Sequence, residues 1–149
     1  MLTKADIMHA VYDKIKKMYP QYEIYLEDSK RNFVTPCFFM KMISVRTPQK
    51  ENMCYNDCTL YISYIPSEDD PAINTIEVRD AIDNAFWRGI QVKDRFIHMT
   101  TLSHQTVGED SDIIEVSLSF AYYDADSDYG DKDVMLIEHV YDDIKIEKG

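Results

Sequence analysis

The chain has 149 residues, of which 45% are hydrophobic, and its 27 acidic side chains outnumber 16 basic ones. That length suits a single domain over residues 1–149 with a hydrophobic core of its own. The formal net charge of −11 argues against tight binding of duplex DNA or RNA, because phosphate contacts need clustered lysine and arginine side chains.

Neither a targeting segment nor a membrane span is expected. Residues 1–15 are charged and lack the apolar run of a signal peptide. The apolar run CFFM at 37–40 ends at Lys41 and is far shorter than the roughly 18 residues of a membrane span. We therefore expect the protein to be made and kept in the cytoplasm, without contact with a membrane.

The residue types that carry catalysis or hold metals form no familiar motif. Cys54 and Cys58 have C-x3-C spacing, and Cys37 makes the number of cysteines odd. His98 and His104 could add two zinc ligands, although zinc sites usually have tighter paired motifs. Phosphate loops and nucleophile elbows are also missing. We expect free thiols, no cofactor and no enzymatic activity.

The first expected element is a helix that begins near Thr3. Thr3 and Asp6 have the spacing of a capping box. Apolar residues then recur every three or four positions, the spacing of one helix face. They are Met8, Val11, Ile15 and Met18. Pro20 ends the pattern, so the helix should bury one face and expose its lysines.

Two strands are expected next. Residues 33–45 (FVTPCFFMKMISV) are rich in aromatic and apolar side chains without a helical period, which predicts a long strand buried on both faces over much of its length. Pro36 lies near its start, where a missing N–H group is tolerated. Residues 57–65 (DCTLYISYI) should form its hairpin partner, which Pro66 closes.

A second helix is predicted from Asn74, which forms a capping pair with Glu77. Its apolar stripe consists of Val78, Ile82, Ala85 and Phe86. Gly89 is suited to the position just after the helix, where a left-handed backbone is common.

The remaining strands are expected at residues 91–102, 113–123 and 134–140. In the second of these, apolar side chains occupy every other position, which is typical of a strand with one buried face. They are Ile114, Val116, Leu118, Phe120 and Tyr122. The order of elements predicts an α+β fold with two helices packed on one face of a mainly antiparallel β-sheet.

An acidic stretch, YYDADSDYGDKD at 122–133, raises the question of a calcium loop. An EF-hand loop takes ligands at positions 1, 3 and 5, turns at a glycine in position 6 and closes with a glutamate at position 12. If Asp124 is position 1, Tyr129 replaces the glycine and Met135 replaces the glutamate. We therefore expect a solvated acidic loop rather than a specific calcium site.

Three stretches carry a resemblance to a known family. They are YEIYLEDSKRNFVTPCFFMKMI (22–43), YISYIPSED (61–69) and EVSLSFAYYD (115–124). In this combination and order, the chain resembles the small tail terminator proteins of phages and defective prophages of Gram-positive bacteria. Pro36, Cys37 and the two following phenylalanines match one family run, and Tyr64, Pro66 and Ser67 match another. The resemblance covers most of residues 3–124, and the acidic tail after Asp124 has no counterpart, so no role is carried over to it.

The resemblance implies a structural role without catalytic residues. It implies a homo-oligomeric ring, usually a hexamer, that sits on the end of the tail tube, stops its growth and later meets the head or neck. Its partners would be other copies, the tail tube protein and possibly sheath and neck proteins. An acidic ring would also suit the passage of DNA, because it repels phosphate.

The acidic residues have a possible place in such a ring. We hypothesise that they lie on a ring surface, either the lumen or the rim that faces the neck. These interface candidates are Asp124, Asp126, Asp128, Asp131 and Asp133.

Two other functions stay open on the sequence alone. Small α+β ring proteins also serve in the neck, so a neck or head-completion ring is the first alternative. The second is a cytosolic module that binds calcium or another ligand through the acidic loop, although the missing glycine and glutamate disfavour it.

Overall fold

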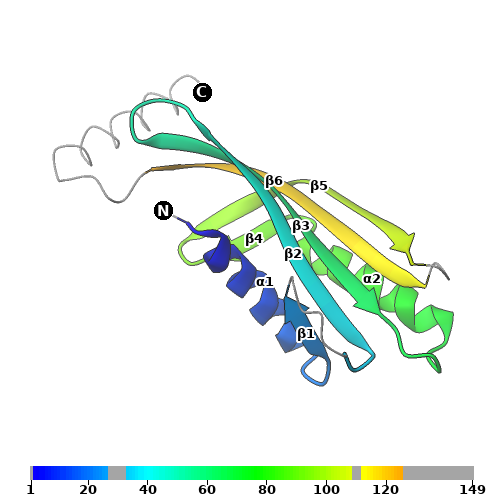
Figure 1. Ribbon diagram of the computed structural model, residues 1–149. Helices are drawn as coiled ribbons and strands as arrows, with labels where there is room; N and C mark the ends of the chain where they lie inside the picture. The colour runs from blue at the N-terminus through cyan, green and yellow to red at the C-terminus, as the bar shows by residue number, and fades with distance from the viewer. Residues whose placement is uncertain (1, 27–32, 109–111, 126–149) are drawn as a thin grey trace.

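The computed structural model describes residues 2–26, 33–108 and 112–125 (Figure 1). These residues form two helices and six strands, which confirms the predicted α+β class. In chain order they are α1 (Lys4–Met18), β1 (Glu23–Leu26), β2 (Cys37–Pro48), β3 (Met53–Ile65), α2 (Ala72–Phe86), β4 (Gly89–Val92), β5 (Arg95–Val107) and β6 (Ile113–Ala125). The strand predicted at 134–140 lies outside the described residues.

Helix α1 begins as the sequence predicts. The Thr3 hydroxyl accepts a hydrogen bond from the Asp6 N–H at 3.1 Å, and the Asp6 carboxylate accepts one from the Thr3 N–H at 2.9 Å. This reciprocal capping box satisfies two N–H groups that have no partner inside the helix. The buried face consists of Ile7, Met8, Val11 and Ile15.

Helix α2 differs from the prediction at both ends. It begins after Pro71, so the expected capping pair of Asn74 and Glu77 lies inside the helix and is wrong. Its last residue is followed by Trp87, and Gly89 already belongs to β4. A Cβ on Gly89 would lie 2.2 Å from the Ile97 carbonyl oxygen, so glycine is required there by a close strand-to-strand approach.

The hairpin of β2 and β3 is confirmed, with Cys37 opposite Ile65 and Pro48 opposite Cys54. The predicted burial of β2 on both faces is wrong. Phe38, Met40 and Met42 are buried, whereas Lys41 and Ile43 between them are exposed, because among the described residues the helices cover only one face.

The region predicted as one strand at 91–102 is two strands joined by a tight turn. Lys93 adopts a positive φ of 54° in this turn, and β4 and β5 then pair antiparallel from Val92 opposite Arg95. The sequence shows no glycine or asparagine at this turn, which explains why it was missed. The four-residue strand β1 was also not predicted; it pairs in parallel with β2.

The six strands are ordered β1-β2-β3-β6-β5-β4. Both helices pack on the same face and share one apolar core with the inward residues of β2, β3 and β6 (Figure 1). α1 contacts β2 near one edge of the sheet and β4 at the other, so the sheet curls around it. The Lys14 ammonium also donates to the Ala85 carbonyl at 2.7 Å and joins the two helices.

Among the described residues, neither helix combines the length and apolar character that crossing a membrane requires.

Candidate functional site

Asp124 is the one acidic-loop residue that the described part of the chain includes. It lies near the end of β6 and is only 6% exposed. Its carboxylate accepts a hydrogen bond from the Leu2 N–H and lies 3.5 Å from the Arg95 guanidinium. The expectation that Asp124 lies in a solvated loop is therefore wrong in this chain: it fastens the start of the chain to β6.

The other interface candidates, Asp126, Asp128, Asp131 and Asp133, lie outside the described residues. The position that a calcium-loop alignment would use first, Asp124, is already paired with Arg95. Within 2–26, 33–108 and 112–125, no three histidine, cysteine or acidic side chains gather in a way that could hold a metal ion.

The suggested zinc ligands have other environments. Cys54 and Cys58 are buried on the helix-facing side of β3. His104 instead points to α2, with its Nε2 3.5 Å from the Asp83 carboxylate.

The thiols are poorly suited to nucleophilic chemistry. Burial raises the pKa of Cys37 and of Cys58 to about 11 from the usual 9.0. A thiol with that pKa is protonated near neutral pH, and the thiolate is the reactive form.

One face of the sheet is available for contacts with other molecules. We call the outward residues of β2, β3 and β6 the open face. No helix among the described residues covers it, and Ile43 and Val45 are 57% and 61% exposed there. Lys41 stacks its ammonium over the Tyr61 ring at 5.1 Å. Apolar and amphipathic side chains that are half exposed in a single chain are typical of interface residues.

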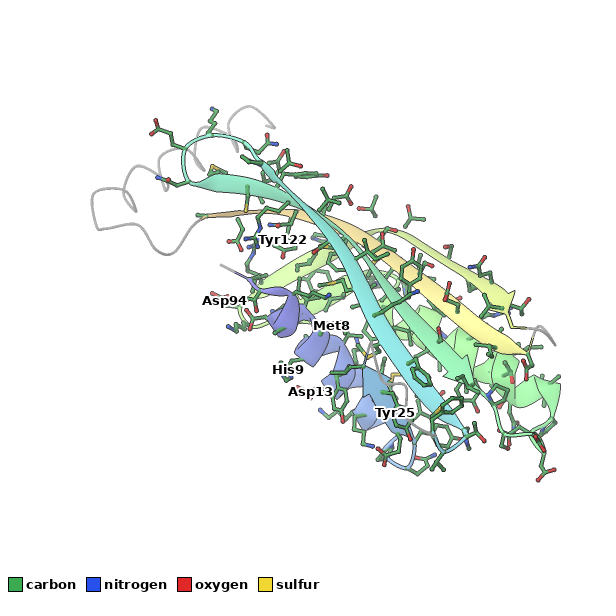
Figure 2. All side chains as sticks on the ribbon, in the orientation of Figure 1. Met8, His9, Asp13, Tyr25, Asp94 and Tyr122 are labelled. Atoms are coloured by element: carbon green, nitrogen blue, oxygen red, sulfur yellow. The ribbon has the colours of Figure 1, made fainter. Side chains whose placement is uncertain are left out.

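An aromatic cluster extends the open face toward β1. The Phe39 ring lies 5.2 Å from Tyr25 and 5.3 Å from Phe33. Phe33 and Val34 are 45% and 69% exposed. Tyr25 lies toward the lower end of the molecule in Figure 2. β2 pairs with β3 over residues 37–48, and β3 pairs with β6 over residues 53–64, so the open face runs along most of the sheet.

The sheet has two edges, and each is only partly paired. β1 pairs with β2 only at residues 37–40, so residues 41–48 have no described partner on that edge. β4 pairs with β5 only at residues 95–98, so residues 100–107 have no described partner on the other edge. We call these the β2 free edge and the β5 free edge. The β5 free edge, TTLSHQTV, contains none of the lysines or prolines that usually protect such edges.

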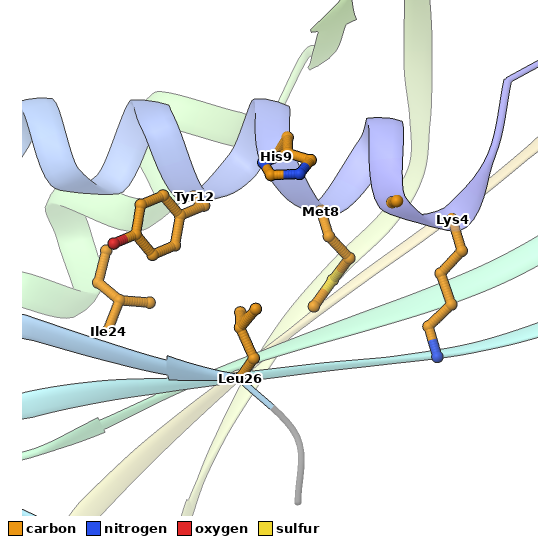
Figure 3. Close-up of a pocket in the computed structure, with 7 residues that line it drawn as sticks. Lys4, Met8, His9, Tyr12, Ile24 and Leu26 are labelled. Carbon is orange, nitrogen blue, oxygen red and sulfur yellow. The ribbon is translucent and has the colours of Figure 1, made fainter. Parts of the chain in front are cut away.

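An apolar groove lies between α1 and β1 (Figure 3). Met8 and Tyr12 of the helix face Ile24 and Leu26 of the strand across it, and Leu26 is 46% exposed. Lys4 and His9 give its helix side a polar rim. Apart from Lys4, His9 and the Tyr12 hydroxyl, the side chains that line the groove are apolar.

Comparisons with known proteins agree with an assembly role. The chain matches the model of a family described as phage tail terminator protein over residues 6–132. None of the curated proteins matches it. A solved structure is similar with a TM-score of 0.51 at 14% identity, covering 87% of this chain and 100% of the other, and this supports the fold alone.

In the described part of the chain, the protein is a small α+β domain with one sheet face that no helix covers and two partly paired edges. Such edges can pair with a strand of another chain. The chain belongs to the phage tail terminator protein family, since the match covers most of its length. That family is structural rather than enzymatic, and its members are parts of phage tails.

Proposed function

We propose that the protein is the tail terminator of a phage or phage-tail-like particle. It forms a ring, expected to be a hexamer, that caps the tail tube, ends tube polymerisation and contacts the head or neck. The family match over residues 6–132 is the observation that carries this proposal. The tail tube protein is its first partner, with sheath and neck proteins as further ones.

The two free edges support a ring. A closed ring of identical copies needs two different surfaces that fit each other, one on each side of the subunit. The β2 and β5 free edges lie on opposite sides of the sheet and run in opposite directions, since each neighbouring pair from β2 to β5 is antiparallel. Copies related by rotation about an axis along the strands could therefore pair β2 with β5 antiparallel.

The charge of the chain supports the passage of DNA through such a ring. A net charge of −11 per copy repels phosphate and opposes tight binding. We propose that Asp126, Asp128, Asp131 and Asp133 contribute to this field from the lumen or from the rim that faces the neck. Assembly would take place in the cytoplasm of the host, after which the ring becomes part of the particle.

Tube polymerisation in vitro tests the proposal. Purified tube protein is polymerised with increasing amounts of this protein, and tube lengths are measured by negative-stain electron microscopy. The proposal predicts shorter tubes with added density at one end. An unrelated acidic protein at the same concentration is the control.

Unchanged tube lengths at saturating protein would contradict the terminator function. Binding to the ends of finished tails without any effect on length would favour the neck or head-completion ring instead.

A further inference from the structure

The two free edges of the sheet carry no acidic side chain of their own. Residues 41–48 of the β2 free edge read KMISVRTP, and residues 100–107 of the β5 free edge read TTLSHQTV. None of the chain's 27 acidic residues lies in either segment. Copies that each carry a charge of −11 repel one another, so segments without carboxylates are where two copies can approach with the least repulsion.

The hairpin that closes β2 and β3 determines which backbone groups point out of the β2 free edge. The Gln49 N–H donates to the Met53 carbonyl at 3.0 Å, just beyond the end of β2. Hydrogen-bonded pairs alternate along an antiparallel ladder, so the odd-numbered residues of β2 bond to β3. The N–H and C=O groups of the even-numbered residues point the other way. On the free edge these residues include Met42, Ser44 and Arg46.

The same alternation determines which groups point out of the β5 free edge. Because the odd-numbered residues of β3 bond to β2, the even-numbered ones bond to β6. The odd-numbered residues of β6 therefore bond to β5, as at Ser117 opposite Ser103. The remaining N–H and C=O groups of β5 point to its free edge. They belong to Leu102, His104 and Thr106.

The side chains of these two sets lie on the same face of the sheet. Met42 belongs to the core under the helices, and Leu102 packs against this core. The His104 Nε2 lies 3.5 Å from the Asp83 carboxylate of α2. Since the side chains of a hydrogen-bonded antiparallel pair point to the same face, pairing the two edges keeps the helices of both copies on one side and both open faces on the other.

The register of such a pairing follows from the lengths of the edges. Each free edge has eight residues, 41–48 and 100–107. Complete antiparallel overlap places Met42 opposite Thr106, Ser44 opposite His104 and Arg46 opposite Leu102. A shift of two residues in one direction would need Met40, which already pairs with β1. A shift in the other direction would need Pro48, which has no N–H group.

We infer that the occupant of the β2 free edge is the β5 free edge of a second copy of this chain, paired antiparallel in this register. The inference rests on the proposed ring and specifies its subunit contact. Each copy offers one edge of each kind, so the contact is heterologous and can continue from copy to copy around a closed ring.

A disulfide across the contact tests the register. Val45 and Ser103 would lie opposite each other in a pair without backbone hydrogen bonds, where Cα atoms are about 4.5 Å apart and a disulfide can form. The variant Val45→Cys/Ser103→Cys is mixed with polymerised tube protein, oxidised mildly and separated on a denaturing gel without reductant. The monomer band should be lost and replaced by a ladder of linked copies.

A link inside one chain is not expected, because β3 and β6 separate β2 from β5. Three strand spacings amount to about 14 Å, and a disulfide needs Cα atoms within roughly 7 Å. Oxidised wild type controls for the native thiols, Cys37, Cys54 and Cys58, which are buried.

The matched controls shift the register by two residues on the same face. Val45→Cys/Thr101→Cys and Val45→Cys/Gln105→Cys should remain mainly monomeric. Ladders from these variants that equal the ladder of Val45→Cys/Ser103→Cys would overturn the register. Linked dimers of Val45→Cys alone would show a two-fold contact between β2 edges and overturn the heterologous pairing.

The tube-length assay on the wild type separates this inference from the proposed function. If the wild type shortens tubes but Val45→Cys/Ser103→Cys gives no ladder, the pairing is wrong and the terminator function stands. A ladder from this variant together with unchanged tube lengths would support the pairing and contradict the terminator function.

Discussion

The two faces of the β-sheet show how one set of strands serves two purposes. On β2, Phe38 and Met40 face the helices and are at most 1% exposed, whereas Ile43 and Val45 on the other face are more than half exposed. The helix-facing side is mainly apolar and holds the fold together, with Asn56 and Asp124 as buried polar residues toward one end. The open face combines tyrosine, lysine, serine and isolated aliphatic side chains, which a single chain does not need for stability. Its composition is consistent with the subunit contacts that we propose.

The largest difference in stability is expected between substitutions of two neighbouring phenylalanines on β2. Phe38 is fully buried against Tyr19, Tyr22 and Tyr64, so Phe38→Ala should lower the free energy of unfolding by about 3–5 kcal/mol. Phe39 is half-buried on the open face, and Phe39→Ala should cost about 1–2 kcal/mol. Urea unfolding measures both. Equal losses would contradict the assignment of the two faces.

Alkaline pH should weaken the fold at two buried thiols, Cys58 on the helix-facing side of β3 and Cys37 on the opposite face of β2. The pKa of Cys37 and of Cys58 is about 11 in the folded chain and near 9.0 when exposed, so between these values the unfolded chain has released protons that the folded chain keeps. Stability should fall as pH rises through this window, on the order of 1 kcal/mol per pH unit for each thiol.

Urea midpoints at pH 8 and pH 10 measure this decline. The variant Cys37→Ala/Cys58→Ala is the control and should show a flatter dependence on pH. If the wild type and the variant decline alike, the thiols are not responsible.

A substitution of Asp124 tests whether this end of β6 contributes to the stability of the single chain. Asp124→Asn keeps an oxygen for the Leu2 N–H but loses the charge that pairs with Arg95, so it should cost about 1 kcal/mol. Asp57→Asn, on the exposed side of β3, is the matched control and should change stability by less than about 0.5 kcal/mol. Unchanged stability in Asp124→Asn, together with loss of assembly, would assign Asp124 to an interface instead.

The smallest effect on stability is expected on the open face. Ile43→Lys/Val45→Lys should change the free energy of unfolding by no more than about 0.5 kcal/mol, because both side chains are largely exposed. The same variant should lose tube capping in vitro, since it adds charge to a subunit contact. Ile73→Lys, at a 56% exposed position on α2, is the control and should retain it. Normal tube capping by the double variant would exclude this part of β2 from the interface.

The sequence predicted the helix-facing side well because burial leaves a periodic pattern. The alternation from Ile114 to Tyr122 and the capping box at Thr3 both correspond to the observed elements. β1 was missed because four residues are too few to show a period. The turn at Lys93 was missed because a residue other than glycine adopts the positive φ.

The assembly surfaces were harder to predict than the core. Whether residues 41–48 have a free edge depends on how far β1 extends beside β2, and the sequence of β2 alone does not contain that information. Asp124 was placed in a solvated loop because its partners, Leu2 and Arg95, are distant in sequence.

Tail length in a deletion strain tests the central claim most directly. A tube end without a terminator still accepts subunits, so deleting the gene should leave head assembly and tube polymerisation intact but unregulated. Negative-stain electron microscopy after induction should show overlong tails that are not attached to heads, and a plasmid copy of the gene should restore the normal length. Tails of uniform, wild-type length that fail to join filled heads would contradict the terminator function and support the neck ring.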